Sequence, residues 1–167
     1  MPASKPKIAI VCYSKSGHSR HIAEQLSEVL DADIYALTTA RYMIPFFGYL
    51  RAGFDSVRRA PTPLTHPLPD IEGYDAAVLC GPVWTSYPAV PLISYMRQAN
   101  YLPQVIGLLL TSGGHSPPQK AYAMAEQVLG RAFAVQEAIP NSIEDTPDMD
   151  DKIARFASDL IAATIKG

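Results

Sequence analysis

A short polar stretch near the start of the chain carries residues suited to binding an anion. It follows an apolar block at residues 8–13, precedes an amphipathic segment, and reads Ser14, Lys15, Ser16, Gly17, His18 and Ser19. A helix that begins at residues 17–19 would direct backbone N–H groups out of its N-terminus, and the serine hydroxyls would add further donors. The stretch therefore predicts a phosphate pocket formed by the helix dipole and hydrogen-bond donors rather than by a cationic side chain.

Two later turns also follow apolar runs. The first comprises Pro82, Val83, Trp84, Thr85, Ser86 and Tyr87, and the second comprises Ser112, Gly113, Gly114, His115 and Ser116. They come directly after the runs at residues 76–80 and 105–110. Ligands of parallel sheets bind at the carboxyl ends of the strands, so we expect the polar stretch and both turns to form one site.

Alternating strands and helices must position these turns. Apolar runs predict strands near residues 8–13, 33–37, 76–80, 105–110 and 132–139, the last at a sheet edge because it is the least apolar. Helical periodicity is present within residues 22–30, 90–96, 121–129 and 153–161. This alternation predicts an α/β fold with a parallel sheet covered on both faces, in a single domain spanning residues 1–167.

Residues 40–70 have an unusual composition, rich in aromatic residues and arginine and ending in a proline-rich run. One interpretation is a crossover segment whose aromatics cover the sheet while its arginines face solvent. The other is a lid or contact surface beside the site that favours an anionic or aromatic partner. The sequence leaves both open.

The composition excludes several classes of protein. A net charge of -2 argues against nucleic acid as a partner, and no apolar run reaches the roughly 18 residues of a membrane span. Cys12 and Cys80 both fall in predicted buried strands, which indicates core thiols rather than a disulfide or a metal site. With no apolar block before the first strand, a cytoplasmic location is expected. No metal site is predicted, and the sequence leaves a homo-oligomer open.

Familiar nucleotide and hydrolase motifs are missing from the sequence. The dinucleotide fingerprint G-x-G-x-x-G and the G-x-S-x-G elbow do not occur. Gly48 and Gly53 have the spacing of a P-loop, but Phe54 and Asp55 stand where Lys and Ser or Thr are required. A Walker-type nucleotidase is therefore disfavoured.

The polar stretch and its flanks, residues 13–23, resemble the flavodoxin signature, in which Ser/Thr-x-Thr-Gly-Asn-Thr opens a helix. Tyr74-Asp75, the following strand and residues 81–84 are similar to the second flavin loop of flavodoxin-like proteins and quinone reductases, and residues 112–115 resemble the third. Ser16 and His18 depart from the usual Thr and Asn but keep hydroxyl and N–H donors. The resemblance implies a flavodoxin-like doubly wound three-layer sandwich with a five-stranded parallel sheet in the order 2-1-3-4-5.

The same resemblance implies FMN as the cofactor. Ser14, Ser16, Gly17, His18 and Ser19 would hold its 5′-phosphate, with the orientation of Lys15 left open. Residues 82–87 would run along the flavin ring, where Trp84 or Tyr87 could stack, and Ser112, Gly113 and Gly114 would allow a close backbone approach. His115 is the residue to which a catalytic role is assigned, donating to the flavin O2 or to a substrate.

Three functions remain to be weighed from the sequence. The first choice is an FMN-dependent oxidoreductase that passes electrons from NAD(P)H to a small acceptor such as a quinone, which the near-neutral charge and the aromatic segment favour. The second is a flavodoxin that shuttles electrons between redox partner proteins. The third is a flavin-free binding domain, against which the phosphate stretch argues.

Overall fold

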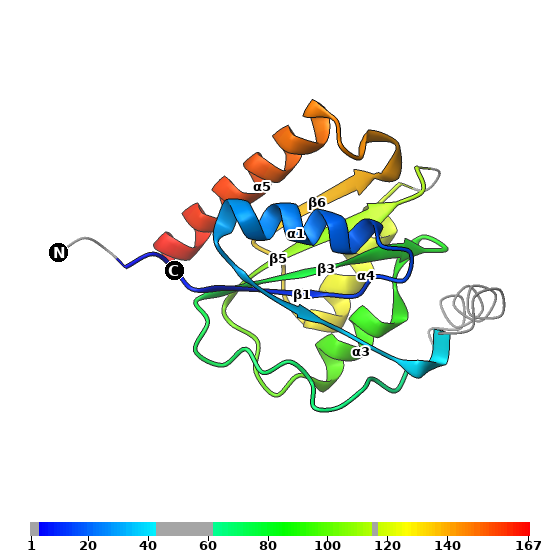
Figure 1. Ribbon diagram of the computed structural model, residues 1–167. Coiled ribbons are helices and arrows are strands. Elements are labelled where there is room, and N and C mark those ends of the chain that lie inside the picture. Colours follow the sequence, from blue (N-terminus) through cyan, green and yellow to red (C-terminus); the bar gives the residue numbers. More distant parts are fainter. Residues whose placement is uncertain (1–3, 43–61, 115–116) are drawn as a thin grey trace.

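The computed structural model describes residues 4–42, 62–114 and 117–167 (Figure 1). Its strands are β1 (Ile8–Cys12), β2 (Asp33–Ala36), β3 (Ala76–Trp84), β4 (Tyr87–Pro88), β5 (Val105–Ser112) and β6 (Val135–Pro140). Its helices are α1 (His18–Leu30), α3 (Val90–Gln98), α4 (Gln119–Leu129) and α5 (Pro147–Lys166), with short 3-10 turns η1 (Ala40–Tyr42) and η2 (Asn141–Ile143). The predicted alternation of strands and helices is confirmed over these residues.

The parallel strands are ordered β2-β1-β3-β5-β6, and the short β4 pairs antiparallel with the end of β3. With β4 set aside, this is the predicted doubly wound order, and β6 lies at the edge as expected. The central strands are buried because both of their faces are covered. Along β1, every residue from Ile8 to Cys12 is buried, which explains why this strand is a continuous apolar run instead of an alternating one.

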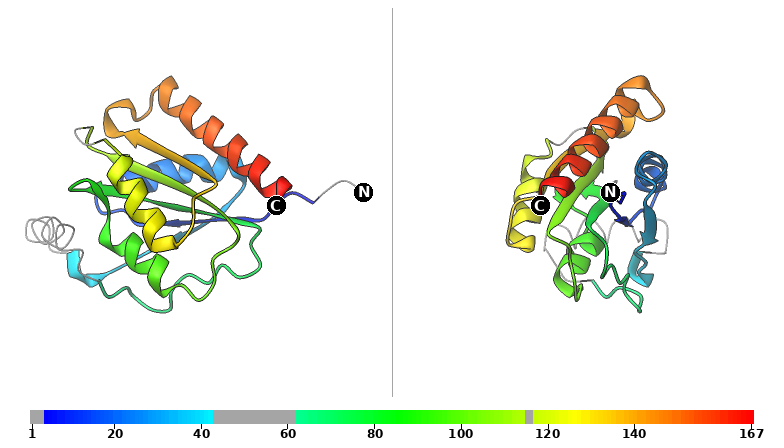
Figure 2. Two further views of the ribbon diagram at one scale, coloured as in Figure 1. Left: turned by 180° about the vertical axis from the view of Figure 1, so that it is seen from behind. Right: turned by 90° about the vertical axis from the view of Figure 1, so that its left-hand side faces the viewer.

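Each face of the sheet has its own core. One contains Ile10, Val78 and Leu109 of the strands together with the apolar stripes of α1 and α5. The other contains Val11, Leu79 and Leu108 together with α3 and α4. Figures 1 and 2 show the resulting three layers, with α1 and α5 side by side on one face and α3 and α4 on the other.

Strand β3 is longer than the sequence predicts. Residues 82–84, expected to be loop, continue the strand because Pro82 pairs with Thr111 of β5 and Trp84 pairs with Tyr87 of β4. The expected loop is therefore a β-hairpin that extends the sheet at its carboxyl edge. The turn itself consists of Thr85 and Ser86.

The cysteines behave as core thiols, as predicted. Cys12 and Cys80 are buried and form no disulfide with each other, and they are register partners on the neighbouring strands β1 and β3. A hydrogen bond with Cys12 and burial both raise the pKa of the Cys80 thiol. A raised pKa keeps this thiol protonated and unreactive.

Most of the aromatic, arginine-rich segment, residues 43–61, lies outside the described residues, so both interpretations of it remain predictions. At its described start, Tyr42 is buried within the core on the α3 side. No described helix combines the length and the apolar character needed to cross a membrane.

Candidate functional site

The three sequence-predicted turns meet at the carboxyl edge of the sheet. Tyr13, at the end of β1, donates its backbone N–H to the carbonyl of Cys80 in β3 over 2.9 Å. The hydroxyls of Ser19 and Thr111 are 2.7 Å apart, which connects the start of α1 with the end of β5. The Tyr13 and Trp84 rings lie edge to face at 5.6 Å, which connects the first turn with the hairpin.

The first turn exposes the N-terminus of α1. Gly17 is its N-cap in a left-handed conformation, φ 98°, which a residue with a Cβ adopts only with strain. Among the described residues no side chain caps this end, and the first turn contains no acidic residue. The helix therefore presents backbone N–H groups and the positive end of its dipole, which suit an anion.

Two serines of this turn make internal hydrogen bonds. The Ser14 hydroxyl accepts the N–H of Gly17 over 3.1 Å, which shapes the turn. Ser19 is 2 % exposed and its hydroxyl is bonded to Thr111, so the group of Ser19 best placed for a ligand is its backbone N–H. Ser16 is exposed at the mouth of the turn.

The basic side chains of this region lean away from the turn. Lys15 donates to the backbone carbonyl of Tyr42, and Arg20 pairs with Glu24 one turn along α1. His18 and His21 face the connection between β6 and α5, where they bond Glu144 and Asp145. The hydrogen bond to Asp145 raises the pKa of His21 by more than desolvation lowers it. The groups that this turn presents are backbone N–H groups and hydroxyls, and their role in binding an anion stays a prediction.

The hairpin carries unusual backbone strain. Thr85 and Ser86 have φ values of 48° and 71°, the left-handed geometry of a type I′ turn, which Asn and Gly normally occupy. Such residues cost on the order of 1 kcal/mol or more each and persist where the surrounding structure enforces them, often at functional sites. The sequence predicts a turn within residues 82–87 but not a β-hairpin, because Thr85 and Ser86 lack the Asn-Gly signal.

An aromatic cluster packs against Trp84 of the hairpin. Trp84 is partly buried between two edge-to-face tyrosines, Tyr13 at 5.6 Å and Tyr42 at 5.2 Å. Each such contact stabilises the pair by about 0.5–1.5 kcal/mol beyond simple burial. The contribution of Tyr42 was not predicted, since it lies 42 positions before Trp84 in the sequence and only the fold brings the two rings together.

The third turn begins at Ser112, which is partly buried at the end of β5. Gly114 has φ 90°, and a Cβ built on Gly113 or Gly114 would meet no described atom within 4 Å. This open space would admit a ligand close to the backbone. His115 and Ser116 lie outside the described residues, so the catalytic role assigned to His115 stays a prediction.

Solved structures show what fold this arrangement represents. A flavoprotein from Lactobacillus acidophilus NCFM in complex with FMN aligns with a TM-score of 0.71 at 18% identity, covering 91% of this chain and 99% of that one. A short-chain flavodoxin associated with a bacterial microcompartment aligns with a TM-score of 0.56 at 10% identity, covering 95% and 99%. The chain has a flavodoxin-like fold.

A third solved structure agrees on this fold. An NAD(P)H:quinone oxidoreductase from Methanothermobacter marburgensis shares the flavodoxin-like fold with a TM-score of 0.53 at 14% identity, covering 96% of this chain and 98% of that one. No protein-family model matches the chain. No curated protein sequence matches it either.

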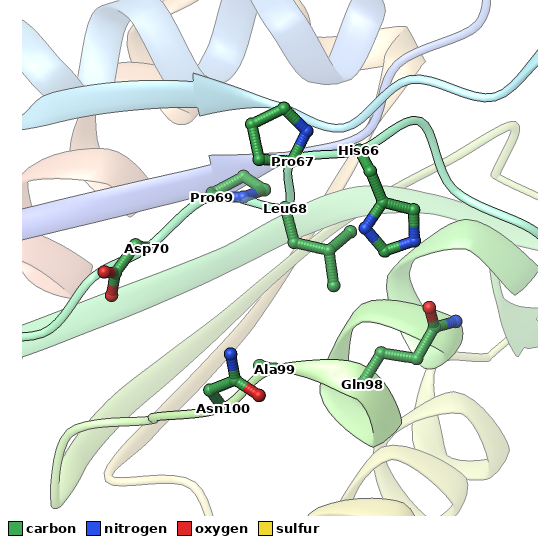
Figure 3. Close-up of a pocket in the computed structure, with 8 residues that line it drawn as sticks. All are labelled: His66, Pro67, Leu68, Pro69, Asp70, Gln98, Ala99 and Asn100. Carbon is green, nitrogen blue, oxygen red and sulfur yellow. The ribbon is translucent and has the colours of Figure 1, made fainter.

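Of two cavities in this flavodoxin-like fold, one adjoins the first of the three turns and the other lies away from them. One of about 350 Å³ adjoins the first turn and lies between Tyr13, Ser14 and Lys15 on one side and Leu37 to Ala40 with Tyr42 on the other. The larger one, about 550 Å³, lies between residues 66–70 and the C-terminal end of α3 (Figure 3). Because α3 runs back toward the start of β5, this larger cavity is not part of the carboxyl-edge site.

Proposed function

We propose that the carboxyl edge binds FMN and that the protein is an oxidoreductase passing electrons from NAD(P)H to a quinone or a similar small acceptor. One observation carries the proposal. The N-terminus of α1 lacks a side-chain cap among the described residues and has no acid of its own in its first turn, and it lies where two further turns converge. An anion with a planar, partly apolar extension fits this combination of groups.

The donor set of the first turn suits a phosphate dianion. The N–H groups of His18 and Ser19, the Ser16 hydroxyl and the remaining capacity of the Ser14 hydroxyl would make charge-assisted hydrogen bonds to it. Gly17 supplies the left-handed bend that turns these donors outward. Lys15 contributes through the shape of the turn, by bonding the Tyr42 carbonyl, and through its charge nearby.

The later turns would line the flavin ring. The hairpin residues Pro82 to Tyr87 offer strained backbone groups at Thr85 and Ser86 and an aromatic surface at Trp84. Ser112, Gly113 and Gly114 leave room for the ring edge, and His115 would donate to it or to the substrate. When bound, FMN supplies the redox chemistry, while the protein orients the ring and excludes water from it.

The acceptor is proposed from the surroundings of the site. Its neighbour is a cavity of about 350 Å³ with tyrosine walls and threonine hydroxyls, the size and character of a small-molecule pocket. The net charge of -2 is small, whereas protein electron carriers of this fold are expected to be strongly acidic. A small aromatic acceptor is therefore favoured over a protein partner.

Titration of the flavin-free full chain with FMN and with riboflavin tests the cofactor. Flavin fluorescence should be quenched at equivalence with FMN, and riboflavin, which lacks the phosphate, should bind at least about 100-fold more weakly, since charge-assisted bonds are each worth about 1.5–3 kcal/mol. Equal binding of the two would overturn the phosphate assignment.

The reaction is tested on the FMN-saturated protein. NADH and NADPH oxidation is followed with a series of quinones under anaerobic conditions. Turnover with a quinone supports the proposal, whereas a protein that binds FMN but turns over no small acceptor would instead be an electron carrier.

A further inference from the structure

Four potential metal ligands gather between the start of α1 and the connection from β6 to α5. His18 Nδ1 lies 2.5 Å from Glu144 Oε2, and His21 Nε2 lies 2.6 Å from Asp145 Oδ1. The two histidines are three residues apart, so they project from the same face of the first turn of α1. The two acids are consecutive and come just before Thr146, the N-cap of α5.

The separations suit a single ion. One ligand atom each from His21, Glu144 and Asp145 lie within 4.8 Å of one another. Zinc bonds to nitrogen and carboxylate oxygen are about 2.0–2.2 Å long, so tetrahedral ligand atoms are about 3.4 Å apart. For the atoms of His21, Glu144 and Asp145, closing around an ion therefore needs movements of about 1 Å or less per group, given those bond lengths. His18, whose Nδ1 bonds Glu144, would have to turn toward the ion to complete the set.

The side chains are free to make such movements. The side chain of Asp145 is 71% exposed and that of His21 is 34% exposed, so their rotation disturbs little packing. Glu144 is more enclosed, at 21%, and its position next to both histidines would anchor the site.

The donor atoms select the kind of ion. Imidazole nitrogens combined with carboxylate oxygens suit Zn²⁺ and its neighbours among the transition metals, whereas Ca²⁺ and Mg²⁺ prefer oxygen alone. We propose that His21, Glu144 and Asp145, with His18 as the fourth ligand, bind one divalent transition-metal ion of the Zn²⁺ class.

Such an ion would join two elements that are far apart in the sequence. It would hold the first turn of α1, which follows the proposed phosphate pocket, to the residues that open α5. The site uses the side chain of His18, whereas the flavin proposal uses its backbone N–H. The two proposals therefore rely on different groups and can fail separately.

The test is calorimetric titration of untagged, chelator-treated full chain with Zn²⁺, in the absence and in the presence of FMN. One ion per chain is expected in both cases. His21→Gln and Asp145→Asn should each weaken the affinity at least tenfold.

Matched controls are available in the same chain. Asp31 is exposed and left-handed like Asp145, with φ 53° against 58°, so Asp31→Asn repeats the chemical change away from the cluster. His66→Gln does the same for the imidazole, at an exposed residue beside the distant cavity (Figure 3). Both controls should retain the wild-type affinity.

Cobalt gives a second readout that does not depend on affinity. Co²⁺ bound in a four- or five-coordinate site should produce visible d–d absorption in the wild type and in both controls, and His21→Gln should abolish it. If Zn²⁺ binds the wild type no more tightly than His21→Gln and Asp145→Asn, or does not bind saturably, the cluster is only a pair of histidine–carboxylate hydrogen bonds and the proposal is wrong.

Discussion

Helices α1 and α5 lie side by side on the same face of the sheet, yet their N-termini are chemically opposite (Figures 1 and 2). Each helix follows a parallel strand, so both begin at the carboxyl edge. The first turn of α5 contains Asp148 and Asp150, whereas the first turn of α1 contains no acid. Acidic groups at a helix N-terminus stabilise the dipole by about 0.3–1 kcal/mol each.

The comparison indicates which helix is suited to a ligand. The positive end of α5 is already balanced by its own carboxylates, so an external anion would be repelled there. The positive end of α1 offers N–H groups, hydroxyls and a glycine bend, and its first turn has no acid of its own. The nearby carboxylates of Glu144 and Asp145 are bonded to the side chains of His18 and His21. Of the two helix N-termini at this edge, that of α5 is stabilised by its own acids, whereas that of α1 is available to bind a ligand.

Giving α1 an acid like those of α5 should have the largest effect. Ser16→Asp places a carboxylate beside the proposed phosphate, where unit charges about 4 Å apart repel by about 4 kcal/mol at an effective dielectric constant near 20. Allowing for solvent screening, FMN affinity should fall by roughly 100-fold or more. The thermal stability of the flavin-free protein should stay the same or rise slightly, as the dipole is balanced.

The control for this change is Ser16→Asn, which is nearly isosteric with the aspartate and neutral. It should lose only a small part of the affinity in the same fluorescence titration. A Ser16→Asp protein that binds FMN as tightly as the wild type would contradict the assignment of α1 as the anion-binding helix.

A substitution that disturbs the packing of α5 on the sheet should have the next largest effect. Gly107 of β5 lies under Phe156 of α5, and an added Cβ would come within 2.6 Å of Cζ of that ring. Gly107→Ala should therefore displace α5 and lower the free energy of unfolding by about 1–3 kcal/mol, as overpacked cores do. Urea unfolding measures this loss, and FMN binding to the folded fraction should be unchanged if α5 has no part in it.

The buried hydrogen bond that fixes the start of α1 should have an intermediate effect. Ser19→Ala leaves the Thr111 hydroxyl, 1 % exposed, without this partner and should cost about 1–3 kcal/mol of stability. Thr111→Val should cost a similar amount. The double variant should cost less than the sum of the two, and strict additivity in the cycle would show that the pair does not act together.

Removing the acids of α5 should have the smallest effect. Asp148→Asn and Asp150→Asn should each lower stability by about 0.3–1 kcal/mol at low ionic strength, with the loss shrinking as salt is added. FMN affinity should not change. If either substitution changes the FMN affinity more than the stability, the N-terminus of α5 takes part in FMN binding and the contrast with α1 is wrong.

Much of the fold could be predicted because local patterns specify it. The continuous apolar runs of β1 and β5 indicated buried parallel strands, and the periodicity after Gly17 placed the start of α1 correctly. Thr146 is the N-cap residue of α5, but its hydroxyl donates to the Ile143 carbonyl instead of capping the helix, a choice that no local pattern indicates.

The candidate site was less accessible to prediction because its geometry depends on long-range pairing. The sequence predicts a turn within residues 82–87, but the hairpin at Thr85 and Ser86 exists because β3 continues along β5 and then pairs with β4, which no local signal indicates. Likewise, the Ser19 hydroxyl looked like a phosphate donor in the sequence, but the fold directs it to Thr111 in the core.

What the sequence determined by itself is the order of elements and the chemistry of each turn, since apolar period, glycine and hydroxyl content act over a few residues. Only the tertiary structure decided which groups face each other. The cluster of His18 and His21 with Glu144 and Asp145 joins residues more than 120 positions apart. Such contacts follow from the strand order that places β1 and β6 in one sheet and α1 beside α5, which no local pattern encodes.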